Sequence, residues 1–326
     1  MDTKKIIPII LILLCTLSLF VGFFNSMLNP KYRESTTTVF DGKIALIRLE
    51  GVIEGSSADS DLFTKNYTAE NVRKNLKKAE EDITVKGILL KIDSPGGTVA
   101  ESQEIYQLIM ETRKIKPVFV SMGDVAASGG YYIAAASDRI YACPGTLTGS
   151  IGVIFNSPDA SELFNKKLGI KAQVIKSGKY KDIGSNTRPM TEDEKSLLAG
   201  IIQNSYVQFL NAITKGRIER IDSYETTKTI LTSENLKTYA DGRVFTGEQA
   251  KNLGFVDELG TTEDTYRAIN SIVSPHKKLP LVPYGKASGL SEIFTNMQES
   301  ITPYDLTKSM VPFSMEHSHK LLYIWE

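Results

Sequence analysis

The sequence predicts an α/β protein built around a largely parallel sheet. Two observations support this prediction. The 326 residues are 41% hydrophobic, which is enough for a packed core in one large domain or two ordinary ones. From residue 43 onward, short apolar runs alternate with longer stretches of helical patterning, and this alternation is typical of parallel strands joined by helical crossovers.

The first element is an apolar run over residues 6–24, which contains no charged residue. At about 1.5 Å per residue, a helix of this length crosses the hydrocarbon layer of a membrane. A cleavable signal peptide is the alternative, but the small residues of a cleavage site are missing after Phe24. We therefore predict a membrane anchor over residues 1–28 and a polar linker over residues 29–42. Lys4 and Lys5 favour a cytoplasmic N-terminus, which gives a single-pass protein of the cell membrane with its body on the extracytoplasmic side.

The body is predicted to span residues 43–275, with residues 276–326 as a C-terminal extension that makes oligomer contacts. Short apolar runs predict strands at 43–49, 87–92, 117–121, 139–142, 151–155 and 171–175. Longer stretches with helical patterning predict helices at 69–81, 99–113, 128–136, 161–168 and 191–215. The last of these opens with Thr191 and Glu194, spaced as in a capping box.

Charge and histidine content exclude several functions. The chain has 38 basic and 38 acidic residues, without the basic excess of a nucleic-acid-binding protein. Its three histidines, His276, His317 and His319, lie near the end and have no partners at metal-ligand spacing, so we expect neither a metal nor a cofactor. A nucleophile in the body would need a lysine or carboxylate base, because no imidazole is available there.

The loop after the second predicted strand reads Asp93-Ser94-Pro95-Gly96-Gly97. The proline and the two glycines let the backbone turn with its N–H groups bare, and such groups at a helix start suit an oxyanion. An ordinary tight turn between a strand and a helix is the alternative.

A second loop carries the candidate nucleophile Ser128, in Ala126-Ala127-Ser128-Gly129-Gly130. The free N–H groups and positive dipole of a helix start would favour a developing alkoxide. The alternative is that this serine only caps the helix. In an open α/β sheet such loops gather at the carboxyl ends of the strands, so the two loops are expected to meet there.

A third loop, residues 177–182, offers a base. A lysine base must be neutral part of the time, which requires burial or nearby positive charge. Lys176, Lys179 and Lys181 are all candidates on these grounds. Asp93 and Asp124 are the carboxylate alternatives, but a single carboxylate is a poor base for a serine hydroxyl.

These loops, in this order, resemble the signal peptide peptidase A family of membrane-anchored serine proteases. The matching segments are 93–97, 126–132, 147–153, 177–182, 241–247 and 250–257, and the resemblance covers about residues 43–270. It implies a Clp protease/crotonase-like fold, in which repeated ββα units form a spiral with a nearly perpendicular sheet.

The resemblance also implies roles for particular residues. Ser128 matches the nucleophile and Lys181 the general base, while Ser150 matches a serine that hydrogen-bonds the lysine amine and orients it. The backbone N–H groups of Gly97 and Gly129 match the oxyanion hole. Gly96 remains an alternative to Gly97.

The implied function is that of a membrane-anchored serine endopeptidase with a Ser-Lys dyad, which degrades remnant signal peptides and other apolar or misfolded membrane-associated segments. Family members form dome-like homo-oligomers in which the dyad can be completed across subunits. The implied partners are therefore peptides, the membrane and further copies of the chain, and no nucleic acid. A crotonase-type acyl-CoA enzyme and a non-catalytic membrane scaffold are the alternatives. The apolar tail, residues 321–325, is expected either to dock as a strand on a neighbour or to enter an active-site groove as a self-substrate.

Overall fold

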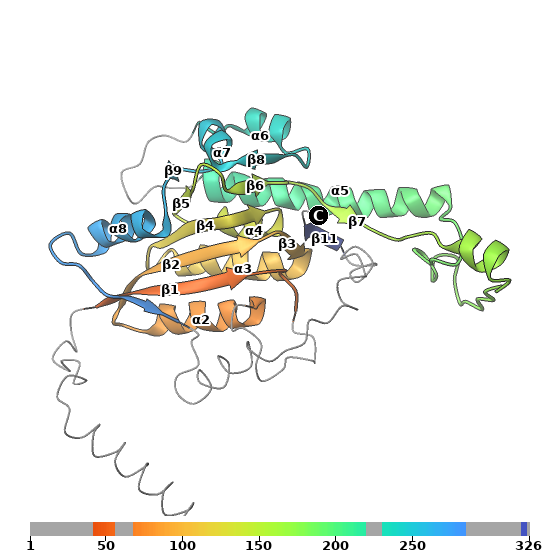
Figure 1. Ribbon diagram of the computed structural model, residues 1–326, viewed down its shortest axis with the longest axis horizontal. Coiled ribbons are helices and arrows are strands. Elements are labelled where there is room, and N and C mark those ends of the chain that lie inside the picture. The colour runs from red at the N-terminus through yellow and green to blue at the C-terminus, as the bar shows by residue number, and fades with distance from the viewer. Residues whose placement is uncertain (1–41, 56–67, 220–229, 285–320, 325–326) are drawn as a thin grey trace, which may run out of the picture. The chain divides into compact units, whose positions relative to one another are not determined.

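The computed structural model describes residues 42–55, 68–219 and 230–284, together with the backbone of residues 321–324. A mainly parallel sheet lies at the centre of the body (Figure 1). Its strands are β1 (Lys43–Glu50), β2 (Val85–Ser94), β4 (Val118–Ala127), β5 (Arg139–Ala142), β6 (Leu147–Gly149), β8 (Val244–Thr246), β9 (Glu258–Leu259) and β10 (Leu281–Pro283). Their order is β10-β1-β2-β4-β5-β9. In addition, β6 pairs with the C-terminal end of β4, and β8 is antiparallel to β6.

Helices cover both faces of this sheet. They are α2 (Ala69–Glu81), α3 (Val99–Thr112), α4 (Gly129–Ala134), α5 (Glu192–Ile213), α6 (Ser233–Tyr239), α7 (Gly247–Leu253) and α8 (Thr262–Val273), with π-helical turns η2 (Leu163–Lys167) and η3 (Thr214–Ile218). The predicted capping box at the start of α5 is present, with Thr191 and Glu194 each accepting a backbone N–H from the other.

The core has two parts, one on each side of the sheet. In β1, Ala45 and Ile47 belong to the larger cluster, on the side of α2, α3 and α4, whereas Ile44 and Leu46 belong to the smaller one with α8. Successive side chains of a strand point to opposite faces. A strand covered on both sides is therefore mostly apolar, which is why 43–49 and 87–92 are apolar apart from Lys43, Arg48 and Lys91.

A second sheet of three short strands lies at the edge of the body where the candidate loops gather. It consists of β3 (Gly96–Thr98), β11 (Leu321–Ile324) and β7 (Ile154–Phe155), with β11 in the middle and antiparallel to both neighbours. The C-terminal segment therefore pairs with Gly97, one of the predicted site residues.

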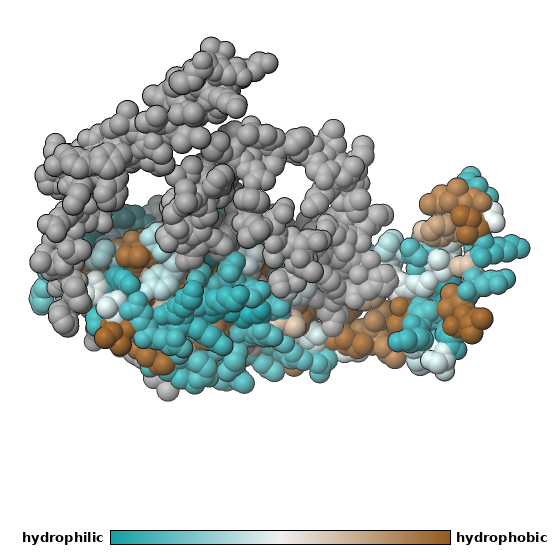
Figure 2. Space-filling model, turned by 90° about the horizontal axis from the view of Figure 1, so that it is seen from below, coloured by the Kyte–Doolittle hydropathy of each residue, from teal (hydrophilic) through white to brown (hydrophobic). Residues whose placement is uncertain are grey.

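An arm, defined here as residues 156–190, leads away from β7 and returns into α5 (Figure 1). It contains η2 and is tied together at its base, where the N–H of Ala160 donates to the carbonyl of Asn186 at 2.8 Å. Apolar side chains of the arm lie open on the surface, as the brown groups in Figure 2 show. They are Leu163, Leu168, Ile170, Val174 and Ile175, each more than half exposed.

The predicted alternation of strands and helices is confirmed, but two predicted strands are wrong. Residues 171–175 form no strand, because they lie in the arm with no strand beside them among the described residues, and Ile175 is fully exposed. Of residues 151–155, only Ile154 and Phe155 are in a strand. The strand before them, β6, was not predicted.

None of the helices in the described ranges is long and apolar enough to cross a membrane. The predicted anchor, residues 1–28, and all of the predicted linker except Gly42 lie outside those ranges.

Candidate active site

The first two candidate loops meet at the carboxyl ends of β2 and β4, as predicted. Ser94 is the register partner of Ala126, and Gly130 packs so closely on Ser94 that a Cβ there would lie 2.9 Å from the Ser94 carbonyl oxygen. Asp93 joins the two strands further, because its Oδ1 accepts the N–H of Val125 at 3.1 Å. This carboxylate alternative is therefore engaged in holding the loops together.

The 93–97 loop does not run straight into a helix, as the sequence predicted, but forms β3 first. Gly96 has φ +107°, which an ordinary residue adopts only under strain. Gly97 is required for a different reason. A Cβ at Gly97 would lie 1.9 Å from the carbonyl oxygen of Ile53, whose backbone brackets the glycine through hydrogen bonds with Gly96 and Thr98.

Ser128 occupies the N-cap position of α4 but does not cap the helix. Its side chain makes no cap hydrogen bond, and its backbone, at φ 52° and ψ −114°, is not in the extended conformation usual for that position. The residue is 1% exposed, and its Oγ has no hydrogen-bond partner within the described part of the chain. A strained residue with a buried, unused hydroxyl at a helix start fits a nucleophile and excludes the capping alternative.

Ser150 lies beside Ser128, because β6 pairs with the end of β4. Ala127 and Gly149 are register partners, and the N–H of Ser128 donates to the Gly149 carbonyl at 2.8 Å. Ser150 itself has φ 47°, and its N–H donates to the carbonyl of Arg243 at 2.8 Å. Apart from glycines, Ser128 and Ser150 are the only described residues with positive φ, and each directly follows one of the paired strands β4 and β6.

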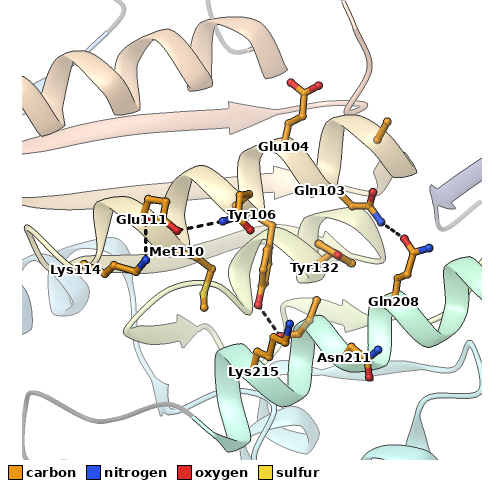
Figure 3. A pocket seen from close by; sticks show the side chains of 13 residues that line it. Gln103, Glu104, Tyr106, Met110, Glu111, Lys114, Tyr132, Gln208, Asn211 and Lys215 are labelled. Atoms are coloured by element: carbon orange, nitrogen blue, oxygen red, sulfur yellow. Dashed lines mark hydrogen bonds and ion pairs between the residues drawn. The ribbon is translucent and has the colours of Figure 1, made fainter.

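Ser150 also lines a cleft of about 480 Å³ between α5 and the segment that leads to β7. Ile151, Val153, Ile202 and Tyr206 give the cleft apolar walls. A larger cleft of about 690 Å³ lies between α3 and α5 (Figure 3), but none of the predicted site residues lines it.

The structure separates the three candidate lysines of the third loop, all of which lie in the arm. Lys176 pairs with Asp182 at 2.5 Å, and Lys179 pairs with Asp193 at the start of α5. Lys181 is exposed and makes no ion pair or side-chain hydrogen bond in the described residues. Two of the three amines are thus engaged in ion pairs with carboxylates, and the third is available.

Lys181 and Ser128 do not meet within one chain, since the lysine is exposed on the arm and the serine is buried in the body. Asp124, the second carboxylate alternative, is exposed and lines another cleft with Cys143, so it is not beside Ser128 either. The structure thus gathers Gly97, Ser128, Gly129 and Ser150, and leaves the predicted base apart.

The turn that carries Lys181 is fixed by charged neighbours. Hydrogen bonds from Arg188, and then from Lys176, hold the pKa of the Asp182 carboxyl well below its usual range. Hydrogen bonds from Arg188, and then from the Thr191 N–H, lower the pKa of Glu194 to about 2. The sequence analysis missed Arg188 and Glu194 as neighbours of this site, because only the folded arm brings them beside Asp182.

Comparison with known proteins identifies the family of this chain. Residues 110–274 match the family described as Peptidase family S49, and residues 62–147 match that described as Clp protease. The Clp protease-like α/β fold that the resemblance implied is therefore confirmed.

Several known relatives are named as proteases. A Synechocystis sp. protein named as a protease is 42% identical, over 68% of this chain and 71% of its own length. An Enterococcus faecium protein named as a signal peptide peptidase SppA is 38% identical, over 68% of this chain and 61% of its own length. The Arabidopsis thaliana protein named serine protease SPPA, chloroplastic, is 31% identical over 81% of this chain, which corresponds to 38% of that longer protein.

Proposed function

The chain belongs to peptidase family S49 and is a serine endopeptidase, and from that premise we propose that its catalytic groups are Ser128 and Lys181. One observation carries the assignment of the nucleophile: the strained, buried Ser128 has a hydroxyl without a partner among the described residues and stands beside Ser150. Family membership also speaks against the acyl-CoA enzyme and the inactive scaffold.

The proposed reaction begins when neutral Lys181 removes the proton of Ser128 as Oγ attacks a peptide carbonyl. The N–H groups of Gly97 and Gly129 stabilise the oxyanion, and Ser150 orients the lysine amine. The lysine then protonates the leaving amine, and water hydrolyses the acyl-enzyme. The assignment of Lys181 rather than its neighbours is supported by the ion pairs that Lys176 and Lys179 already make.

The dyad is proposed to form between copies of the chain. Lys181 needs a dry environment to act as a base, yet it is exposed here, and the arm that carries it presents five apolar side chains to solvent. A second copy that covers the arm would bury both. We therefore propose a homo-oligomer, a dome-like ring as in the family, in which Lys181 of one copy serves Ser128 of another.

Substrates are proposed to bind as an extended strand between β3 and β7. The segment Leu321–Ile324 occupies that position in this structure, antiparallel to both strands and in register with Gly97. Addition of a strand to an exposed sheet edge is a common mode of peptide recognition. The C-terminal tail would then be a self-substrate or a competitor, and deletion of residues 321–326 should raise the initial rate on added peptide. An unchanged rate and unchanged assembly would contradict this role for the tail.

We propose apolar substrates such as remnant signal peptides, because the predicted anchor would hold the active site close to the membrane. The charge-free run at residues 6–24 would tether the body to the cell membrane, with the N-terminus cytoplasmic and the active site on the other side. Peptides released within the bilayer would then be the nearest substrates.

The test uses the full chain in detergent and a synthetic signal peptide. Lys181→Ala and Ser128→Ala should each abolish cleavage, whereas Lys176→Ala and Lys179→Ala should lose at most a few-fold, because exposed ion pairs contribute only about 0–1 kcal/mol. Full activity of Ser128→Ala would refute the nucleophile, and full activity of Lys181→Ala would refute the base.

A mixing experiment tests completion of the dyad across copies. The inactive Ser128→Ala and Lys181→Ala proteins are dissociated, mixed and reassembled. Mixed particles should regain cleavage, because a copy with intact Ser128 can face a copy with intact Lys181. If mixed particles form but remain inactive, the dyad lies within one chain.

A further inference from the structure

The most densely connected ion cluster of the arm surrounds Arg188. Its Nε donates to Asp182 Oδ2 at 3.0 Å, and its Nη2 donates to Asp182 Oδ1 at 2.7 Å. The same guanidinium contacts Glu194, through Nη1 to Oε2 at 2.9 Å and Nη2 to Oε1 at 2.5 Å. Arg188 therefore grips two carboxylates, each through two hydrogen bonds, which is the strongest geometry an arginine forms with carboxylates.

Both carboxylates are well placed to hold the turn. Glu194 is 2% exposed and belongs to the capping box that starts α5, so it is a fixed point of the body. Asp182 directly follows Lys181 in the chain, and Arg188 Nη2 also reaches the Asp182 backbone carbonyl at 3.3 Å. The clamp thus joins the residue next to Lys181 to the first turn of a 22-residue helix.

Three cations and three carboxylates are paired along the arm and at the start of α5. Asp182 pairs with Lys176 and Arg188, Arg188 also pairs with Glu194, and Lys179 pairs with Asp193. Without Arg188, the carboxylate adjacent to Lys181 would keep only Lys176 as a partner. A less neutralised carboxylate favours the protonated amine, which cannot accept a proton from serine.

We propose that Arg188 is a positioning residue for catalysis, which anchors the Lys181 turn to α5 and neutralises the neighbouring Asp182 carboxylate so that the amine can act as a base. This inference rests on the proposed function, in which Lys181 is that base. Arg188 contacts Asp182 and Glu194 and acts through them.

The proposal separates Arg188 from a merely structural residue by its effect on pH dependence. In Arg188→Gln, kcat at neutral pH should fall about 10- to 100-fold, because the base is no longer held in place. The ascending limb of kcat against pH should also move towards alkaline pH by on the order of one unit, because a less neutralised carboxylate next to Lys181 favours the protonated amine. KM should change little, since Arg188 is not in the peptide groove.

Two further variants isolate the electrostatic part. Arg188→Gln combined with Asp182→Asn removes the carboxylate as well, and should return the pH profile to its original position while kcat stays low. Arg188→Lys keeps the positive charge but cannot form the paired hydrogen bonds of the guanidinium. It should therefore bring the pH profile closer to that of the parent than it brings the value of kcat. Lys195→Gln is the matched control, because Lys195 is a cation at the start of α5 whose ion pair among the described residues is with exposed Glu192.

The measurements are kcat and KM from pH 6 to about 10 on a signal-peptide substrate, with thermal unfolding of each full-length variant. If Arg188→Gln lowers the melting temperature but leaves kcat and its pH profile as in the parent, Arg188 is structural and the proposal is overturned. Lys181→Ala in the same series distinguishes failure of the proposed base from failure of the proposed role of Arg188. An active Lys181→Ala protein refutes the base itself, whereas an inactive one with an unaltered Arg188→Gln profile refutes only the clamp.

Discussion

Gly97→Ala is the substitution whose effect the structure specifies most closely. A Cβ at Gly97 would lie 1.9 Å from the carbonyl oxygen of Ile53, 2.5 Å from its carbonyl carbon and 2.6 Å from its nitrogen. These are backbone atoms, so no side chain can rotate away. The Ile53 N–H donates to Gly96 at 2.8 Å and the Ile53 carbonyl accepts from Thr98 at 2.7 Å, so relief of the clash must move β3 or break this bracket.

The expected magnitude has two parts. Overpacking of this kind costs about 1–3 kcal/mol of unfolding free energy. For a body of this size, that lowers the melting temperature by roughly 2–4 °C per kcal/mol. A shift of β3 also moves the Gly97 N–H away from the substrate carbonyl, and the loss of one oxyanion donor lowers kcat by about 10²–10³-fold.

The assay compares kcat, KM and melting temperature of the Gly97→Ala protein with those of the parent. Gly145→Ala is the matched control, because a Cβ there would meet no atom within 4 Å and both quantities should be unchanged. A Gly97→Ala protein with the expected drop in melting temperature but an unaltered kcat would refute the assignment of this N–H to the oxyanion hole, and Gly96 would replace it. An unaltered melting temperature would show that the bracket around Gly97 is wrong.

Three further predictions concern catalysis, stability and pH. Ser150→Ala should lower kcat by less than the roughly 10²–10⁴-fold that an acid–base residue contributes, because Ser150 only orients the base; a peptide assay that finds a loss equal to that of the base variant would contradict this. Arg217→Met should cost about 3–5 kcal/mol in chemical unfolding, since Arg217 is 0% exposed and pairs with Asp257, whereas exposed Arg267→Met should stay within about 0.5 kcal/mol. Glu194 has its pKa lowered from 4.5 to about 2 in the folded chain, so its stabilisation is complete above pH 4.5 and is lost as the pH falls towards 2. The melting temperature of Glu194→Gln should therefore change less with pH over that range than that of the parent. An equal change in both proteins would contradict the pairing.

Sequence reasoning predicted the body well, because the signals for its elements are local. The runs at 43–49 and 87–92 are largely apolar because each strand is covered on both faces, and Thr191 with Glu194 marks a helix start within four residues. The strand predicted at 171–175 shows where local signals end. Its apolar pattern is real, but the arm offers those residues no strand to pair with among the described residues, and a strand needs a partner.

The site residues stay a prediction, and the sequence contained no signal for their geometry. Nothing local indicates that Ser150 adopts φ 47°, because that conformation follows from the pairing of β6 with β4 on one side and β8 on the other. The choice among Lys176, Lys179 and Lys181 was likewise open in the sequence. It depends on Asp193, which is 14 residues from Lys179 and reaches it only after the arm folds against α5.

The arrangement of the site explains why a base carried on a projecting arm is workable. Ser128 holds a positive φ that costs about 1–2 kcal/mol and a buried hydroxyl whose missing partner costs about 1–3 kcal/mol. Within one chain nothing offsets these costs, since Lys181 is exposed on the arm and Ser128 is buried in the body. In the proposed assembly the amine of a second copy would supply the missing partner of the Ser128 hydroxyl, and burial of the arm would favour the neutral form of that amine. Catalytic competence would then be tied to assembly, so that a dissociated copy carries a nucleophile but no base and is inactive towards the proteins around it.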